Sequence, residues 1–216
     1  MSTLKDKLRA LSSLSSPFAF DPSSTPLDPQ TLFLDWLQLA IDTGIREPHA
    51  MILSTVDANN EPDARVLILK NLDDNGWHFS TGRNSPKGQQ IENSPSVALT
   101  FYWQKLGRQV RIRGTGTDMG FEQRNDDFLD KPIGSRIQAL LGKQSKIVAS
   151  HKPDELATAR MAAFLAQHPA HVDPNWTVYA VKPREVEFWQ AHQQRQHVRL
   201  RYRLGESCWI KELLGA

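Results

Sequence analysis

The sequence predicts an α+β domain, mainly β, in which a small antiparallel barrel or sandwich carries flanking helices. Short runs of β-branched and aromatic residues, separated by turn residues, fill residues 49–117, and similar runs return after residue 176. The connections at residues 57–62 and 73–76 are short enough for hairpins, which favours antiparallel pairing over a parallel sheet with helical crossovers. Strands at both ends of the chain are therefore expected to close one sheet.

Residues 1–28 are predicted to form a flexible N-terminal arm. Ser, Pro and Asp dominate residues 12–29, a composition typical of an extended segment, and the first ten residues are expected to be a short helix or frayed chain. The composition leaves open whether the arm folds over a site or remains a tail.

The remaining residues, 29–216, are expected to form a single domain with a helical insertion at about 118–167. Its first helix starts at the N-cap Asp28 with Pro29 in the first turn and ends near Gly44. A second helix is expected after Ser85, and two or three helices fill the insertion. The predicted strands are residues 50–56, 64–69, 76–81, 96–103, 108–114, 176–181, 185–189, 196–204 and 207–211.

Composition excludes several classes of protein. The 26 Lys and Arg residues against 24 Asp and Glu leave a net charge of +2, too small for a dedicated nucleic-acid binder. Cys208 is the only cysteine, so no intrachain disulfide forms, and we expect a buried, inert thiol in a reducing compartment. No apolar run reaches the ~20 residues of a membrane helix, and the N-terminus lacks a secretory pattern. We therefore expect a soluble cytoplasmic protein without membrane or nucleic-acid partners.

Two predicted strands carry cationic side chains on one face. Polar and apolar residues alternate in residues 109–113 and again in residues 195–204. A solvated sheet face explains one such strand taken alone, but two of them favour a small anionic ligand. The residues concerned are Gln109, Arg111, Arg113, Arg195, His197, Arg199, Arg201 and Arg203, together with Lys70, Lys87 and Lys143.

The start of the second helix, at Ser85 to Gly88, offers backbone donors beside Lys87, which suits a phosphorylated cofactor better than a polynucleotide. Taken alone, this motif is typical of an ordinary capped helix. His168 and His171 flank Pro169, which breaks the helix that would align them, so a surface loop is favoured over a metal site. The sequence contains no phosphate-binding P-loop, dinucleotide fingerprint or nucleophile elbow.

The order of these segments resembles the pyridoxamine 5′-phosphate oxidase family over about residues 27–214. The matching segments are residues 47–57, 65–70, 79–81, 87–90, 107–110, 143–145 and 186–190. The resemblance implies an FMN-binding split barrel that is active as a homodimer, with two flavins in clefts between the subunits. It assigns no metal.

The resemblance also implies a set of cofactor-binding residues. These are Arg65, Val66, Leu67, Ile68, Leu69, Lys70, Ser80, Thr81, Lys87, Gln109, Gln144, Ser145, Trp189 and Arg199. One arginine that the family places on the flavin phosphate is replaced here by Pro86, so we expect a reduced flavin affinity.

On the substrate side, the resemblance assigns the vitamer phosphate to Lys70, Asp127, Lys131 and Ser135, and the reacting carbon to Arg195 and His197. Asp127 stands where the family has a tyrosine, and Lys131 where it has an arginine. An aspartate repels a phosphate dianion, and a lysine lacks the bidentate grip of an arginine. Gln196 and Val198 also depart from the family pattern around the reacting end.

The implied activity is oxidation of pyridoxamine or pyridoxine 5′-phosphate to pyridoxal 5′-phosphate, with oxygen reduced to hydrogen peroxide. One alternative is an FMN-dependent oxidase of the phenazine-biosynthesis type, although the retained Lys70 argues against it. Another is a non-catalytic protein that binds flavin or a B6 vitamer. A nucleic-acid binder that uses the two arginine strands would lose affinity steeply with salt and would lack a flavin.

Overall fold

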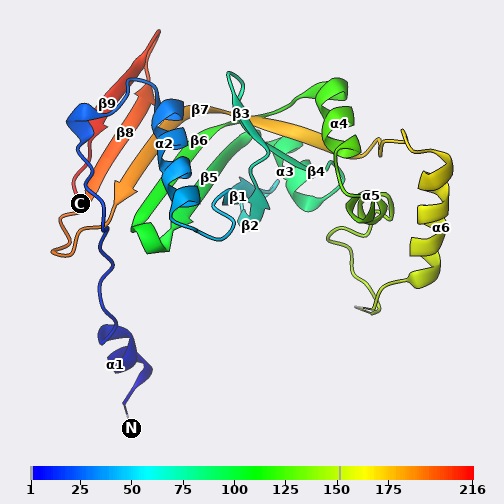
Figure 1. The fold of residues 1–216 in the computed structure, drawn as a ribbon, viewed down its shortest axis with the longest axis horizontal. Helices are drawn as coiled ribbons and strands as arrows, with labels where there is room; N and C mark the ends of the chain where they lie inside the picture. Colours follow the sequence, from blue (N-terminus) through cyan, green and yellow to red (C-terminus); the bar gives the residue numbers. More distant parts are fainter. Residues whose placement is uncertain (1, 151) are drawn as a thin grey trace. The chain divides into compact units, whose positions relative to one another are not determined.

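The structure is a computed structural model that describes residues 2–150 and 152–216. In this part of the chain, nine strands form one sheet in the order β2-β1-β5-β6-β7-β4-β3, with β8 paired to β7 and β9 paired to β8 (Figure 1). The strands are β1 (Ala50–Val56), β2 (Pro62–Ile68), β3 (Asn71–Asp73), β4 (Gly76–Gly82), β5 (Ser96–Trp103), β6 (Arg108–Asp118), β7 (Trp176–Gln190), β8 (Val198–Leu204) and β9 (Trp209–Leu213). The α+β, mainly β fold expected from the sequence is confirmed.

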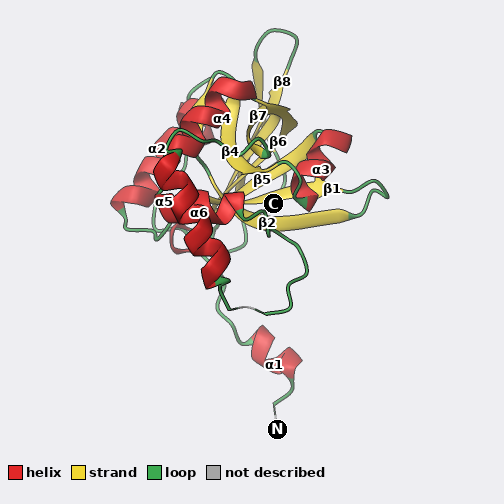
Figure 2. Ribbon diagram, turned by 90° about the vertical axis from the view of Figure 1, so that its right-hand side faces the viewer, coloured by secondary structure: helices red, strands yellow, loops and turns green. Residues whose placement is uncertain are grey.

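Six α-helices occur in the described residues, coloured red in Figure 2. They are α1 (Leu4–Arg9), α2 (Pro29–Asp42), α3 (Pro86–Asn93), α4 (Gly120–Leu129), α5 (Ile133–Leu140) and α6 (Glu155–Gln167). Short 3-10 turns lie at Pro22–Ser24 and Gln104–Leu106. The expected helix at residue 29, the helix after Ser85 and the three helices of the 118–167 region are all present.

Contacts divide the chain into two compact units. The first unit contains residues 2–51, 99–113 and 183–216, and the second contains residues 52–98 and 114–182. In the first unit α2 packs its apolar face on the sheet, because Phe33 contacts the ring of Phe101 at 4.8 Å and Trp36 contacts Phe188 at 5.1 Å between centroids. In the second unit α5 packs on α6.

The sequence predicts two strands over residues 176–189, but the structure has one continuous strand, β7. The first half of β7 pairs with β4 at residues 176–181, and the second half pairs with β8 at residues 185–190. Pro183, which has no N–H to donate, lies between the two sets of partners. The proline therefore marks the change of partner without interrupting the strand.

Two other local expectations need correction. The three-residue strand β3 was missed because it is too short for an alternating pattern, although its hairpin to β4 follows the expected turn, with Asp73 opposite Gly76. Cys208 was expected to be buried, but its side chain is exposed. It lies in the tight turn before β9, in which the amide of Gly205 donates to the carbonyl of Cys208 at 2.9 Å.

Several residues before α2 are held by the first unit. The side-chain amide of Gln190 donates to the carbonyl of Phe18 at 2.8 Å, and the hydroxyl of Tyr202 donates to the carbonyl of Pro26 at 2.7 Å. Gly107 adopts a positive φ of 60°, and a Cβ there would lie 3.0 Å from the backbone of Ser15. The boundary of the predicted arm at residue 28 stays a prediction. No described helix combines the length and the apolar character that crossing a membrane would require.

Candidate functional site

The first candidate group lies at the start of α3. The hydroxyl of Ser85 caps the helix by accepting from the amide of Gly88 at 3.3 Å, and it also lies 3.5 Å from the ammonium of Lys87. Lys87 is only 6% exposed, and Thr81 at the end of β4 is 1% exposed. Burial lowers the pKa of Lys87, and the positive charge of Arg65 lowers that pKa further.

Arg65, on β2, is oriented by neighbouring side chains. Its guanidinium donates to the hydroxyl of Thr55 at 2.6 Å and to the amide oxygen of Gln90 at 3.2 Å, and it pairs with the more exposed Asp63 at 2.5 Å. Gln90 also accepts from Thr55 at 2.5 Å. Thr55 and Gln90 were not predicted as site residues from the sequence. For Thr55, the available signal was a polar residue at a buried position of a largely apolar strand.

The Lys87 environment is that of a site for an anion. In the described residues, no carboxylate lies within ion-pair distance of Lys87, although Asp63 is close enough to raise its pKa. A buried ammonium with only hydroxyl contacts is stabilised by a bound anion. Backbone amides at the start of α3 add a favourable dipole.

A second group surrounds Asp127 on α4. One carboxylate oxygen lies 3.6 Å from the ammonium of Lys70, and the other lies 3.7 Å from that of Lys131. The indole Nε1 of Trp176 donates to the same carboxylate at 2.7 Å, and the ammonium of Lys131 lies 4.2 Å over the indole ring. Asp127 thus joins two of the expected substrate-binding lysines to the first residue of β7.

A pocket of about 560 Å³ opens beside this group. It is lined by Lys131, Gly134, Ser135, Gln138, Ala139, Lys143, Gln144 and Trp176. A smaller pocket of about 140 Å³ shares Gln144 and Trp176 with it and reaches Ser85 at the start of α3. Because they share these lining residues, the two pockets adjoin, one beside Lys131 and the other beside Ser85. The side chain of Gln144 accepts from the amide of Gly82 at 3.3 Å.

The third group belongs to the first unit and contains the expected residues of the reacting end. The rings of Trp189 and His197 lie 4.9 Å apart. The amide of His192 donates to Nδ1 of His197 at 3.1 Å, which leaves Nε2 available to a ligand. Arg195 lies in the intervening turn with a positive φ of 61°, a conformation that is rare for residues other than glycine.

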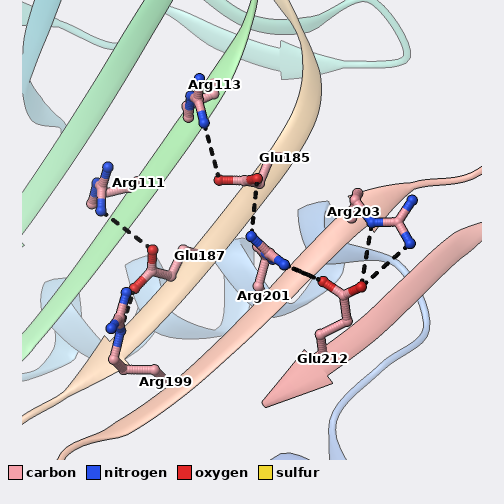
Figure 3. Close-up of polar contacts among 8 residues, drawn as sticks. All are labelled: Arg111, Arg113, Glu185, Glu187, Arg199, Arg201, Arg203 and Glu212. Carbon is pink, nitrogen blue, oxygen red and sulfur yellow. Dashed lines mark hydrogen bonds and ion pairs between the residues drawn. The ribbon is translucent and has the colours of Figure 1, made fainter. Parts of the chain in front are cut away.

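Glutamates cross-link the cationic faces of β6 and β8, as Figure 3 shows. Glu187 on β7 pairs with Arg111 at 3.3 Å and with Arg199 at 2.8 Å. Glu185 pairs with Arg201 at 3.6 Å, and Glu212 pairs with Arg201 at 2.7 Å. The strands were expected to present cations to an anionic ligand, but their pairing with these glutamates was not predicted. The alternation of polar and apolar residues within a strand does not reveal which acidic residues lie beside its arginines on the neighbouring strands.

The structure therefore brings the predicted site residues together in separate groups, each within one of the two units. Within the second unit, Arg65 neighbours Lys87, and Lys70 neighbours Asp127 and Lys131. Ser135 and Gln144 line one pocket with Lys131. Within the first unit, Trp189 neighbours His197, and Arg199 lies opposite Trp189 in the β7–β8 register.

Most of the chain is similar to known proteins. The sequence model described as pyridoxamine 5′-phosphate oxidase matches residues 37–190, and the model of a pyridoxine 5′-phosphate oxidase C-terminal dimerisation region matches residues 176–215. A pyridoxine/pyridoxamine 5′-phosphate oxidase of Actinobacillus pleuropneumoniae is 42% identical over 190 residues, covering 87% of this chain and 89% of the relative. One from Paraburkholderia phymatum is 39% identical, covering 94% and 93%.

Two solved structures are also similar. PhzG from Burkholderia lata, in complex with tetrahydrophenazine-1-carboxylic acid, has a TM-score of 0.85 at 27% identity and covers 94% of this chain and 100% of that one. An FMN-binding protein of Nostoc punctiforme related to pyridoxamine 5′-phosphate oxidase has a TM-score of 0.68 at 18% identity, covering 88% and 98%. The fold is thus that of the split-barrel flavoproteins. With 319 matches among curated proteins led by these oxidases, the chain belongs to the pyridoxamine 5′-phosphate oxidase family.

Proposed function

We propose that this protein is an FMN-dependent oxidase that converts pyridoxamine or pyridoxine 5′-phosphate to pyridoxal 5′-phosphate, with oxygen reduced to hydrogen peroxide. Family membership supports the reaction class. The observation that carries the cofactor assignment is the buried Lys87 beside Arg65 at the start of α3. Two cations, the Ser85 hydroxyl and helix amides fit the phosphate of FMN.

Bound FMN would supply the hydride acceptor for the substrate and the route by which electrons reach oxygen. In the proposal, Arg65 and Lys87 hold the cofactor phosphate. The backbone of β2 from Val66 to Ile68, with Leu69 and Lys70, lies along the cofactor, as do the side chains of Ser80 and Thr81. Thr55 and Gln90 fix the guanidinium of Arg65, so that less side-chain entropy is lost on binding.

The proposal gives the substrate two kinds of contact. Lys70, Lys131 and Ser135 would bind its phosphate, and Arg195 and His197 would contact the carbon that loses the hydride. His197 is held by the His192 amide and by Trp189, so its ring orientation is set before the substrate arrives. Orientation of this kind supplies much of the rate of such a reaction. An amine substrate would be oxidised to the imine, which water hydrolyses to the aldehyde and ammonia.

A homodimer is supported by the match to the C-terminal dimerisation region, which covers β7 to β9. We further propose that the cofactor lies at the subunit interface, where Gln109, Gln144, Ser145, Trp189 and Arg199 would complete its site. We also propose a cytoplasmic location in which the exposed thiol of Cys208 stays reduced.

A second candidate function is oxidation of a different substrate on the same cofactor. The similarity to PhzG and the carboxylate of Asp127, which pairs with Lys131 of the pocket lining, favour it. A phenazine precursor carries a carboxylate and no phosphate, so the two candidates differ in the anion that the pocket must accept.

The first test is oxygen consumption by purified protein reconstituted with FMN. With pyridoxamine 5′-phosphate, we expect oxygen uptake and equal formation of hydrogen peroxide. A Lys87→Gln variant should bind FMN about 10- to 100-fold more weakly, since a charge-assisted contact contributes about 1.5–3 kcal/mol. Tight FMN binding without turnover of any B6 vitamer would overturn the oxidase assignment and leave a carrier or a different oxidase.

A further inference from the structure

The charge balance around Asp127 bears on which substrates the pocket accepts. Lys70 and Lys131 approach opposite oxygens of one carboxylate. That carboxylate is 14% exposed, and the Lys131 side chain is 13% exposed. The Lys70 side chain is more exposed, at 40%. The two ammonium groups therefore share one anionic partner, and the pair with Lys131 is the better shielded from solvent.

Trp176 holds this carboxylate in place. Its indole N–H donates to Asp127 at 2.7 Å while its ring face contacts the ammonium of Lys131 at 4.2 Å. The ring of Phe128, the neighbour of Asp127 on α4, packs edge-on against Trp176 at 6.0 Å between centroids. Asp127 is fixed by α4 and β7 together, so it does not swing away at low cost when a ligand arrives.

The other charged groups near the pocket add no further excess of positive charge. Lys143, the second lysine of the lining, pairs with Asp154 at 3.3 Å. Asp126 and Asp130 lie beside Asp127 at the surface of α4. The lining adds neutral hydrogen-bonding groups from Ser135, Gln138 and Gln144. A neutral, hydroxyl-bearing end of a substrate suits such a lining better than a dianion does.

We propose that Asp127 sets the charge selectivity of this pocket. By offsetting one of the two positive charges of Lys70 and Lys131, it weakens the preference for a phosphate dianion and admits B6 vitamers with an unphosphorylated hydroxymethyl group. Asp127 acts here as a specificity-determining residue, since it lowers affinity for one substrate class without contributing a contact specific to the other. This inference rests on the proposed function and names the substrate class of the same pocket.

The test compares pyridoxal with pyridoxal 5′-phosphate by titration calorimetry on the FMN-reconstituted protein, and pyridoxamine with its 5′-phosphate by oxygen consumption. For the wild-type protein, we expect the phosphorylated and free compounds to differ in Kd and in kcat/KM by less than about tenfold. A preference above about 100-fold for the phosphorylated compounds would overturn the inference, and this measurement needs no variant.

The variant Asp127→Asn keeps the acceptor for the Trp176 N–H and removes the charge. We expect it to bind pyridoxal 5′-phosphate at least about tenfold more tightly and pyridoxal with unchanged affinity. The matched control is Asp130→Asn, which removes one charge from the same end of α4 without a contact to either lysine, and it should leave both affinities unchanged.

The outcomes separate the two proposals. An unchanged phosphate preference in Asp127→Asn, or an equal gain in Asp130→Asn, would contradict the selectivity role while leaving the oxidase assignment intact. Absence of turnover for both pyridoxamine and its 5′-phosphate, with FMN bound, would contradict the oxidase assignment itself. The calorimetric comparison of pyridoxal with its 5′-phosphate would then still report on the charge selectivity of the pocket.

Discussion

The guanidinium of Arg108 lies 4.2 Å over the ring of Trp36, and it is buried without a carboxylate partner in the described part of the chain. Its Nε donates to the side chain of Gln190 at 2.8 Å, and its second amino group donates to the carbonyl of Ala19 at 3.3 Å. Burial lowers its pKa to about 10, so it remains charged at neutral pH. One side chain thus joins β6, α2, β7 and the segment before α2.

Replacing Arg108 by alanine should therefore cost about 2–4 kcal/mol of unfolding free energy, because it removes a buried cation–π contact and leaves two acceptors without a donor. Urea denaturation measures the loss. Arg111→Ala, on the same strand but 47% exposed, should cost less than half as much. Equal losses in the two variants would show that burial of Arg108 adds nothing.

The sequence was sufficient for elements whose signals are local. Helix α2 begins at Pro29 because Asp28 accepts from the amide of Thr31 at 2.8 Å. The sequence predicted Asp28 as the N-cap and Pro29 in the first turn. Strands β1 and β5 have the predicted bounds because each is a short run rich in apolar and β-branched or aromatic residues between turn signals. The resemblance placed Lys70, Asp127 and Lys131 around one phosphate, but it did not predict that both lysines pair with the carboxylate. The contact from Trp176 was not predicted either, because that residue comes from a distant element and only the folded chain brings it to Asp127.

The Glu187 carboxylate should contribute more to stability than Glu212. Glu187 is 7% exposed and pairs with Arg111 and Arg199, whereas Glu212 is 28% exposed (Figure 3). Glu187→Gln leaves two guanidinium groups near a buried neutral amide, and we expect a loss of about 2–4 kcal/mol. For Glu212→Gln we expect a much smaller loss, because exposed ion pairs contribute little to stability.

Equilibrium unfolding in urea at two salt concentrations distinguishes the two glutamates. The loss in Glu187→Gln should persist at 0.5 M salt, because buried pairs are screened less than exposed ones. A loss that disappears with salt would place Glu187 among the ordinary surface ion pairs.

The affinity for FMN should fall as the pH rises through the alkaline range. Burial and the charge of Arg65 lower the pKa of Lys87 below its usual value of 10.5 in the free protein, and a bound phosphate would raise it again. The complex then holds more protons than the free protein in the pH range between these two pKa values, so binding weakens as the pH rises through that range.

Quenching of flavin fluorescence between pH 7 and pH 10 measures this dependence. Lys87→Gln should bind FMN more weakly at pH 7 and show a flatter dependence on pH, while Lys143→Gln, an exposed lysine paired with Asp154, should keep the wild-type slope. A wild-type slope retained in Lys87→Gln would show that another group, or FMN itself, titrates instead.

The side chain of His197 offers a test of the reacting end that leaves the turn intact. Its Nδ1 accepts from the amide of His192 at 3.1 Å, and the side-chain oxygen of an asparagine is able to accept from the same amide. His197→Asn should therefore preserve the conformation around Arg195, whose positive φ of 61° already strains the backbone. The variant would lose the ring that contacts Trp189 and the free Nε2.

We expect kcat/KM for the preferred vitamer to fall by about 100-fold, the scale of a misplaced reacting group, with the Kd for FMN unchanged within about threefold. Because FMN binding is measured separately, a parallel loss of flavin would assign His197 to the cofactor site instead of the substrate site.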